Sequence, residues 1–204
     1  MDNTLIRARL GGALHEVGSP PRGEPWNCTD IADLLSAPAE LMPAAVLVPV
    51  VLRPQGASLV LTRRNEGLTH HAGQVSFPGG RIEAADSGVV GAALREAQEE
   101  IGLPPEAVEV IGLADVYRTV TGFEVTPVVG IVPPDLPLAP HPGEVADLFE
   151  APLHYLLDPA HQHERTAFWR GRERHYYEID YEGRRIWGAT AAMIVNLGRR
   201  LVLA

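Results

Sequence analysis

Three glutamates at helical spacing are the residues of this chain best suited to chemistry: Glu96, Glu99 and Glu100. The apolar residues of the same segment recur at offsets of four, three and four and are Val90, Leu94, Ala97 and Ile101. This pattern predicts an amphipathic helix with one buried stripe. At about 100° per residue the three glutamates fall on a different arc, beside Ala92, so we expect them to share one face. Oxygen ligands of this kind favour hard ions such as Mg²⁺ or Mn²⁺.

Such a face is unfavourable without a counter-charge. Like charges three or four positions apart cost roughly 0.2–0.5 kcal/mol per pair. Glu99 and Glu100 also meet the negative end of the helix dipole, a mismatch of about 0.3–1 kcal/mol each. A divalent cation would reverse both penalties. The alternative is a solvated acidic face in which Arg95 pairs with Glu99 across one turn.

The ends of this helix are marked in the sequence. Asp86 or Ser87 is positioned to cap its start, and Gly102 followed by Pro104 and Pro105 ends it. Upstream, paired glycines follow a short strand, which allows close approach of the backbone to another group. With Glu83 and Asp86 nearby, the carbonyl groups of the glycine pair could face the same ion as the glutamates.

The string from Phe77 to Leu103 resembles the signature of the Nudix hydrolase family, a loop–helix–loop metal site. The matching residues are Gly79, Gly80, Asp86, Arg95, Glu96, Glu99, Glu100, Gly102 and Leu103. Two departures occur: Asp86 takes a position usually held by Glu, and eight residues rather than seven separate it from Arg95. The part from Arg95 to Leu103 follows the signature without change.

The preceding segment is similar to the extra signature of the coenzyme A pyrophosphatase branch of this family. The residues that carry this similarity are Leu61, Thr62, Arg64, Leu68, His71, Gly73, Gln74, Val75, Phe77, Pro78, Gly79 and Gly80. That branch tolerates Asp at the position of Asp86 and a longer loop there. The stretches from Val116 to Gly130 and from Ile186 to Ile194 are also similar to it, so the resemblance covers most of the chain beyond about Ala44.

The resemblance implies an α/β (α+β) fold, a Nudix-type α/β/α sandwich with a mixed β-sheet between helices. We expect one domain over residues 1–204, with residues 1–43 as an N-terminal helix and an irregular arm. The implied activity is metal-dependent hydrolysis of the diphosphate linkage of coenzyme A or its acyl derivatives, giving 4'-phosphopantetheine and adenosine 3',5'-bisphosphate. The alternatives are the same chemistry on another nucleoside diphosphate conjugate, such as ADP-ribose or a dinucleotide, and a sensor that binds nucleotide without cleaving it.

The family also implies roles for individual residues. Glu96, Glu99 and Glu100, with a backbone carbonyl of Gly79 or Gly80, would hold one to three Mg²⁺ or Mn²⁺ ions, and Arg95 would orient the glutamates. Glu144 is our candidate for the general base, with Glu96 as the competing assignment and an exposed loop carboxylate as the simpler interpretation of Glu144. The candidates for substrate binding are Arg64, Arg81, Arg118 and His71. For the arginines the alternative is a surface ion pair, and for His71 a hydrogen bond that fixes its loop.

The sequence also predicts the helices and strands that must position these residues. We expect a short helix within Leu5 to Val17, strands within 44–53, 58–63, 74–77, 108–118 and 123–132, a hairpin of 175–181 with 184–187, and a closing helix over 189–203 in which Gly198 is a weak point. Pro54, Gln55, Gly56 and Ala57 should connect the first two strands as a hairpin. The proline-rich stretch 133–143 should be a loop.

Composition limits the class of protein. The chain has 204 residues, 46% hydrophobic and 21% charged, which is typical of a globular protein. Its longest aliphatic stretch, Ala44 to Leu52, is interrupted by Pro49 and is far shorter than the ~20 residues of a membrane span, so we expect no membrane association. A net charge of -9 argues against nucleic-acid binding. The single cysteine, Cys28, excludes an intrachain disulfide and, with no visible export signal, indicates the cytoplasm. A homodimer is left open.

Overall fold

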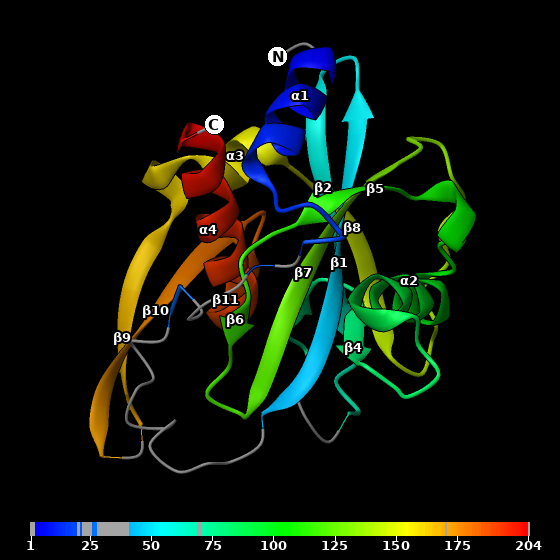
Figure 1. Cartoon of the computed structure of the whole chain (residues 1–204). Helices are drawn as coiled ribbons and strands as arrows, with labels where there is room; N and C mark the ends of the chain where they lie inside the picture. The colour runs from blue at the N-terminus through cyan, green and yellow to red at the C-terminus, as the bar shows by residue number, and fades with distance from the viewer. Residues whose placement is uncertain are drawn as a thin grey trace.

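The computed structural model describes residues 3–19, 21, 26–27, 41–68, 71–169 and 171–203 (Figure 1). Its helices are α1 (Asn3–Ala13), α2 (Gly88–Ile101), η2 (Pro105–Ala107), α3 (Leu153–Leu157), η3 (Pro159–His161) and α4 (Gly188–Leu203). Its strands are β1 (Met42–Arg53), β2 (Gly56–Arg64), β3 (Val75–Ser76), β4 (Gly79–Arg81), β5 (Glu109–Leu113), β6 (Tyr117–Arg118), β7 (Phe123–Val132), β8 (Val145–Pro152), β9 (His163–Trp169), β10 (Arg172–Tyr181) and β11 (Arg184–Trp187).

A mixed sheet forms the centre of the molecule. Its main order is β3-β2-β1-β7-β5, while β4 pairs with β1, β6 with β7 and β8 with β2. β1 and β7 are parallel, from Met42 opposite Phe123 to Val51 opposite Val132. The predicted hairpin of β1 and β2 is confirmed, with Arg53 opposite Gly56, so that only Pro54 and Gln55 form the turn. A second sheet, in the order β11-β10-β9, contains the predicted hairpin near the C-terminus.

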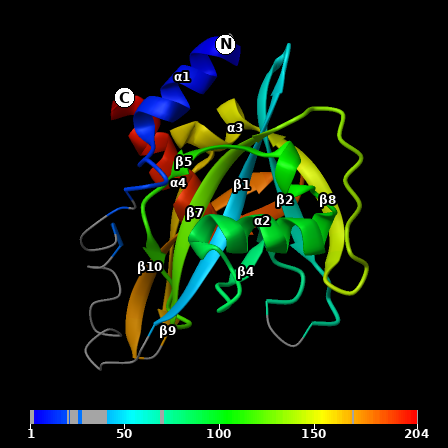
Figure 2. The ribbon, with the colours of Figure 1, turned by 45° about the vertical axis from the view of Figure 1, so that its right-hand side comes forward.

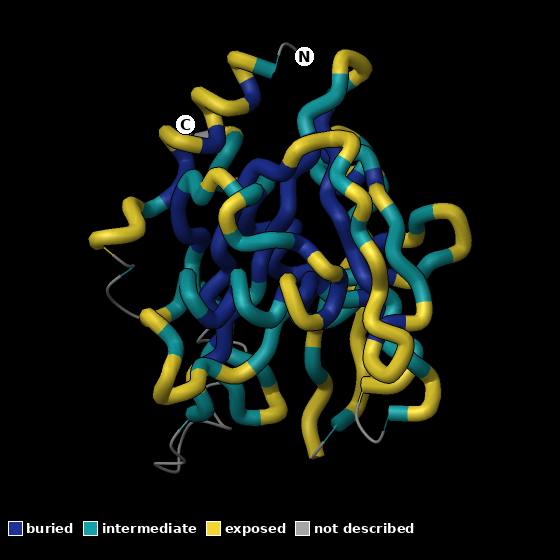
Figure 3. Tube along the Cα trace, turned by 90° about the vertical axis from the view of Figure 1, so that its right-hand side faces the viewer, coloured by how far each residue is buried: buried dark blue, intermediate teal, exposed yellow. Residues whose placement is uncertain are grey.

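Helices cover both faces of the mixed sheet, as the family resemblance implies (Figures 1 and 2). On one face α2 packs on β1 through Ala92, Ala93 and Ala97, all fully buried. These small side chains let the helix backbone approach the sheet closely. On the other face lie α1, α3, α4 and the second sheet, and the buried residues form a continuous interior (Figure 3). The mixed sheet therefore positions α2, which packs against β1 and β4.

Several expectations need correction. The predicted strand 108–118 is divided into β5 and β6, and Gly198 lies inside an unbroken α4. β4, β8, α3 and β9 were not anticipated: β4 has only three residues, and residues 144–174 carry no clear periodicity. In α2 the predicted stripe is only half right: Ala97 and Ile101 are fully buried, but Val90 and Leu94 are partly exposed.

The N-terminal helix is present as α1. Most of the irregular arm predicted to follow it, and Cys28, lie outside the described residues. Among the described residues, no helix combines the length and apolar character that crossing a membrane requires.

Candidate active site

Helix α2 carries the candidate site, and its two ends differ from one another. Ser87 precedes the helix as predicted, but its side chain makes no capping hydrogen bond. Asp86 is not a cap either, because its carboxylate accepts a hydrogen bond from the backbone N–H of Glu83 at 2.8 Å and pairs with Arg95. Gly102 ends the helix as predicted, at a φ of 65° that favours glycine, and donates to the carbonyl of Gln98.

The proline-rich loop closes the C-terminal end of α2. The backbone N–H of His141 donates to the carbonyl of Glu100 at 2.8 Å, and that of Ala139 to Ile101 at 3.0 Å. These are two of the carbonyls that a helix leaves without internal partners. Further along, the N–H of Asn65 donates to the carbonyl of Glu144 at 2.8 Å. The loop thus joins the end of α2 to the end of β2, a connection that the sequence did not reveal.

Gly79 and Gly80 are required because no side chain fits at either position. β4 pairs with β1, placing Gly80 opposite Ala45 and Gly79 opposite Val46. A Cβ atom on Gly79 would collide with the carbonyl oxygen of Ala45, and one on Gly80 would collide with the carboxylate of Glu96. The backbone of Gly80 therefore lies directly against the Glu96 carboxylate, the close approach that the sequence predicted.

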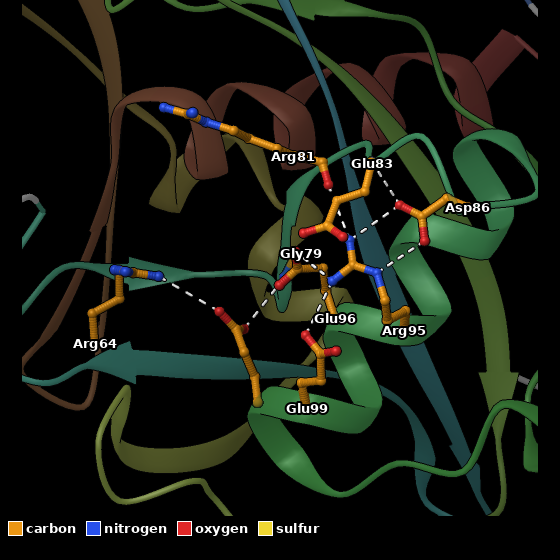
Figure 4. A network of polar contacts seen from close by, with 9 residues as sticks. Arg64, Gly79, Arg81, Glu83, Asp86, Arg95, Glu96 and Glu99 are labelled. Atoms are coloured by element: carbon orange, nitrogen blue, oxygen red, sulfur yellow. Dashed lines mark hydrogen bonds and ion pairs between the residues drawn. The ribbon is translucent and has the colours of Figure 1, made fainter.

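Arg95 joins the loop to the helix (Figure 4). Its guanidinium donates to both carboxylate oxygens of Asp86 at 2.9 and 3.1 Å, and to the backbone carbonyl of Arg81 at 3.1 Å. It also donates to Glu96 and Glu99, each at 3.0 Å. The hydrogen bonds from Arg95 and from the N–H of Glu83 lower the pKa of Asp86, and the bond to Asp86 is the main reason why the pKa of Arg95 is raised. The predicted Arg95–Glu99 pair is thus one bond of a larger network.

Glu100 faces a second arginine. Its side chain is only 3% exposed, and its Oε1 lies 3.5 Å from Nη1 of Arg64 on β2. Its Oε2 accepts a hydrogen bond from the N–H of Gly79 at 3.3 Å. Burial raises the pKa of Glu100 to about 7, and the charges of Glu96 and Glu144 add to this while Arg64 and the Gly79 N–H oppose it. The Nε of Arg64 is buried and has no hydrogen-bond partner in the described part of the chain.

The three glutamates do not share one environment. Glu99 is 58% exposed, Glu96 17% and Glu100 3%. Glu96 and Glu99 turn to Arg95 (Figure 4), whereas the carboxylate of Glu100 lies near Arg64. Within the described ranges no three His, Cys, Asp or Glu side chains converge as metal ligands. Arg95 thus compensates the charges of Glu96 and Glu99, and Arg64 compensates that of Glu100.

The donor set nevertheless fits a hard divalent cation. Burial raises the pKa of Glu96, and the charges of Glu99 and Glu144 raise it further against the influence of Arg95. Glu96 and Glu100 therefore lie in a carboxylate-rich and partly dry region, where added positive charge is favourable. All available donors are oxygens, and the backbone at Gly80 adjoins the Glu96 carboxylate. Mg²⁺ and Mn²⁺ prefer such ligands.

The other predicted residues lie at different distances from this network. Arg81 is exposed, with its guanidinium carbon 5.5 Å from the centre of the Phe123 ring. The side chain of Arg118 donates to Glu124 at 2.8 Å, and its backbone N–H donates to the side chain of Asn27, a residue that no sequence pattern singled out.

His71 is exposed and its Nδ1 lies 3.0 Å from the side-chain oxygen of Gln74, which matches the loop-fixing interpretation. Glu144 is exposed at the end of the proline-rich loop, as its simpler interpretation required, yet it raises the pKa of both Glu96 and Glu100.

Comparison with known proteins agrees with this geometry. Residues 41–173 match the family described as NUDIX domain. The chain is 47% identical over 158 residues, 78% of this chain and 82% of the relative, to proteins called "Uncharacterized Nudix hydrolase NudL" from Escherichia coli and Salmonella paratyphi B. These matches define the class as Nudix hydrolases, which act on small nucleotide-like substrates. The chain belongs to the Nudix family and is a pyrophosphohydrolase.

Solved structures with similar folds include the Nudix hydrolase RenU from M. smegmatis, at 24% identity over 55% of this chain and 71% of that one, with a TM-score of 0.45. A MutT/nudix family protein from Enterococcus faecalis is 13% identical and covers 99% of this chain and 75% of its own, with a TM-score of 0.49.

Proposed function

We propose that this Nudix hydrolase cleaves the diphosphate linkage of coenzyme A or its acyl derivatives, releasing 4'-phosphopantetheine and adenosine 3',5'-bisphosphate. The observation that carries the proposal is that the segment similar to the coenzyme A pyrophosphatase branch lies against the Nudix helix. Arg64, from that segment, faces Glu100 at 3.5 Å, and Gly79 donates to the same carboxylate. Residues of both signatures thus contribute to one site.

Glu96, Glu99 and Glu100, with a backbone carbonyl of Gly79 or Gly80, would hold Mg²⁺ or Mn²⁺. Bound there, such ions neutralise the substrate diphosphate and make water a stronger nucleophile. Arg95 keeps Glu96 and Glu99 oriented through charge-assisted hydrogen bonds, and Asp86 fixes Arg95 in turn. This support gives Arg95 a positioning role.

Glu144 is proposed as the general base. It is exposed to solvent, so its carboxylate is accessible to a water molecule. Its backbone carbonyl is held by Asn65, which fixes the end of the loop close to Arg64. Glu96 is the competing assignment, and it is engaged by Arg95. Glu144→Gln separates the two assignments: if Glu144 is the base, this variant should lower the rate with little change in metal affinity, and an unchanged rate would leave the role to Glu96.

Arg64 and Arg81 are proposed to bind substrate phosphates, with Arg118 and His71 as further contacts. Both Arg64 and Arg81 flank the network around α2, whereas Arg118 is engaged by Glu124. The cytoplasm is the proposed compartment, on the basis of the single cysteine. A homodimer is compatible with this function and is tested by sedimentation analysis.

The test is a substrate panel. Coenzyme A, acetyl-coenzyme A, ADP-ribose, NADH and a damaged nucleoside triphosphate are incubated with Mg²⁺, and the products are separated by chromatography. We expect coenzyme A and its acetyl form to be cleaved with the highest kcat/KM, giving adenosine 3',5'-bisphosphate together with 4'-phosphopantetheine or its S-acetyl form, respectively. A clear preference for ADP-ribose or NADH would refute the substrate and leave the Nudix chemistry in place. Equal turnover after exhaustive chelation would refute the metal requirement.

A further inference from the structure

In the pair formed by Arg64 and Glu100 the carboxylate is buried, whereas the guanidinium leaves its Nε without a hydrogen-bond partner among the described residues. Glu100 is almost completely buried, and a buried carboxylate needs a compensating charge. Arg64 supplies it at a distance of 3.5 Å between Nη1 and Oε1. The Nε of Arg64 is buried without a hydrogen-bond partner among the described residues. A guanidinium has five N–H donors, so this arginine is held by charge while much of its donor capacity is unused.

The same carboxylate is the one proposed as a metal ligand. A divalent cation bound to Glu100 would lie close to the positive guanidinium of Arg64. At separations of a few ångströms near a protein surface, such charges repel each other by about one to several kcal/mol. Arg64 and a divalent cation therefore compete for Glu100.

We propose that Arg64 is the counter-ion of Glu100 in the metal-free protein, and that it gives up this carboxylate to a divalent cation and turns to the anionic diphosphate of the substrate. The proposal rests on the proposed function of Glu100 as a metal ligand. Arg64 is 27% exposed, so its guanidinium already reaches the surface of the site. Its unpartnered Nε offers a donor for a phosphate oxygen, the group that arginine binds best in a bidentate manner.

Metal and substrate binding are coupled through this exchange. The metal displaces Arg64 from Glu100, and the displaced guanidinium favours a diphosphate. Because binding couplings are reciprocal, the diphosphate in turn favours the metal. Without nucleotide, Arg64 lowers the affinity of the site for the cation.

Binding of Mn²⁺ without nucleotide tests the proposal, with free Mn²⁺ measured by electron paramagnetic resonance. Arg64→Gln and Arg64→Met remove the charge with different polarity and should bind Mn²⁺ more tightly than the parent by roughly tenfold, about 1.4 kcal/mol. Arg64→Lys keeps the charge and should stay close to the parent.

The matched control is Arg63→Gln. Arg63 is the preceding residue of β2, and its guanidinium pairs with Glu66 at 3.4 Å. It should leave Mn²⁺ affinity unchanged. Circular dichroism confirms that each variant is folded.

Equal or weaker Mn²⁺ binding by both uncharged Arg64 variants, with normal binding by the parent, would overturn this proposal alone. If the parent itself binds no Mn²⁺, the metal site of the proposed function is wrong and the proposal fails with it. An equal gain in Arg63→Gln would show a general charge effect and would also contradict the role of Arg64.

Discussion

Arg95 and Arg64 lie on opposite sides of the α2 carboxylates and hold them differently (Figure 4). Arg95 donates to two oxygens of Asp86, to Glu96, to Glu99 and to a backbone carbonyl, all between 2.9 and 3.1 Å. Arg64 lies 3.5 Å from Glu100 and leaves its Nε without a partner among the described residues. One arginine has nearly all its donors used, and the other has donors to spare.

The two arginines therefore differ in how easily each can change its partner. A guanidinium with many short bonds is costly to move, because each carboxylate that loses it must be resolvated or paired again. A guanidinium held mainly by charge changes partner at lower cost. Arg95 is therefore suited to fix the loop to the helix, and Arg64 is suited to bind and release ligands. Mutations at the two arginines should have correspondingly different effects.

The largest effect is expected for Glu100→Gln. This change keeps the shape of the side chain, removes one proposed ligand charge and leaves Arg64 without its counter-ion. We expect kcat to fall by at least ~10³, since each ~1.4 kcal/mol of barrier is tenfold, while the fold is retained. Steady-state kinetics at saturating Mg²⁺ measure the effect. A rate within tenfold of the parent would mean that Glu100 is not part of the reaction site.

Arg95→Lys should lower kcat by roughly ten- to a hundredfold, the usual effect of removing a group that orients metal ligands. Lysine keeps the charge but cannot bond to Asp86, Glu96 and Glu99 together. Its Tm should also fall, whereas that of the matched Arg64→Lys variant should not. Differential scanning calorimetry on both variants decides, and a greater loss of Tm in Arg64→Lys would reverse the contrast.

A third arginine, Arg81, extends the comparison to specificity. Its carbonyl accepts a bond from Arg95, but its side chain is exposed and reaches over Phe123. We expect 3'-dephospho-coenzyme A to be cleaved with roughly ten- to a hundredfold lower kcat/KM, because a charge-assisted hydrogen bond to the missing phosphate is worth about 1.5–3 kcal/mol. In Arg81→Ala the gap should shrink, since that contact is already lost. An unchanged gap would assign the 3'-phosphate to another residue.

The smallest effect concerns an ion pair outside the site, between Asp115 and Arg200. Asp115 accepts hydrogen bonds from Arg200 at 2.7 Å and Asn196 at 3.1 Å, and lies 2.8 Å from the Nε2 of His15. Burial raises the pKa of Asp115, but the bonds to His15, Asn196 and Arg200 together have the larger, opposite effect. The pKa of Asp115 therefore lies below its ordinary value. Asp115→Asn should reduce the free energy of unfolding by about 1–2 kcal/mol near neutral pH.

The pH dependence gives the sign of that effect. A depressed folded pKa stabilises the protein above the unfolded pKa of about 3.9, and the contribution is lost as the pH falls through the folded pKa. The parent should therefore keep its advantage over Asp115→Asn at pH 5 and lose it at lower pH. Urea unfolding at several pH values measures this. A constant difference down to the acid limit would show that the charge of Asp115 is not involved.

The sequence predicted the local parts of the site and missed the long-range ones. Helix α2 ends at Gly102 and the glycine pair touches Glu96 because spacing and steric rules act within a few turns. The split of the glutamates between two arginines depends on Arg64, at the end of β2, reaching Glu100 of α2, which no local pattern encodes. Asp86 or Ser87 was expected to cap the helix, but for Asp86 a bidentate bond to Arg95 outweighs a cap.

The same division applies to the fold. The β1–β2 hairpin follows from two adjacent apolar runs, whereas β8 pairs with β2 from a distant part of the chain, and its edge position needs no strong alternation. Strand β9 is exposed along nearly its whole length, so it lacks the hydrophobic pattern by which strands are recognised.

The parallel pairing of β1 with β7 has a consequence for the order in which the protein is made. On the ribosome, β1 is complete once Arg53 has been added, but the neighbour on its other edge, β7, ends only at Val132. During that interval the growing chain exposes an apolar strand edge, which invites pairing with other chains. The hairpin with β2 and the pairing with β4 both lie on the opposite edge of β1, and both strands are made before α2. Chain order thus completes one edge of the central strand early and leaves the β7 edge open until β7 is translated.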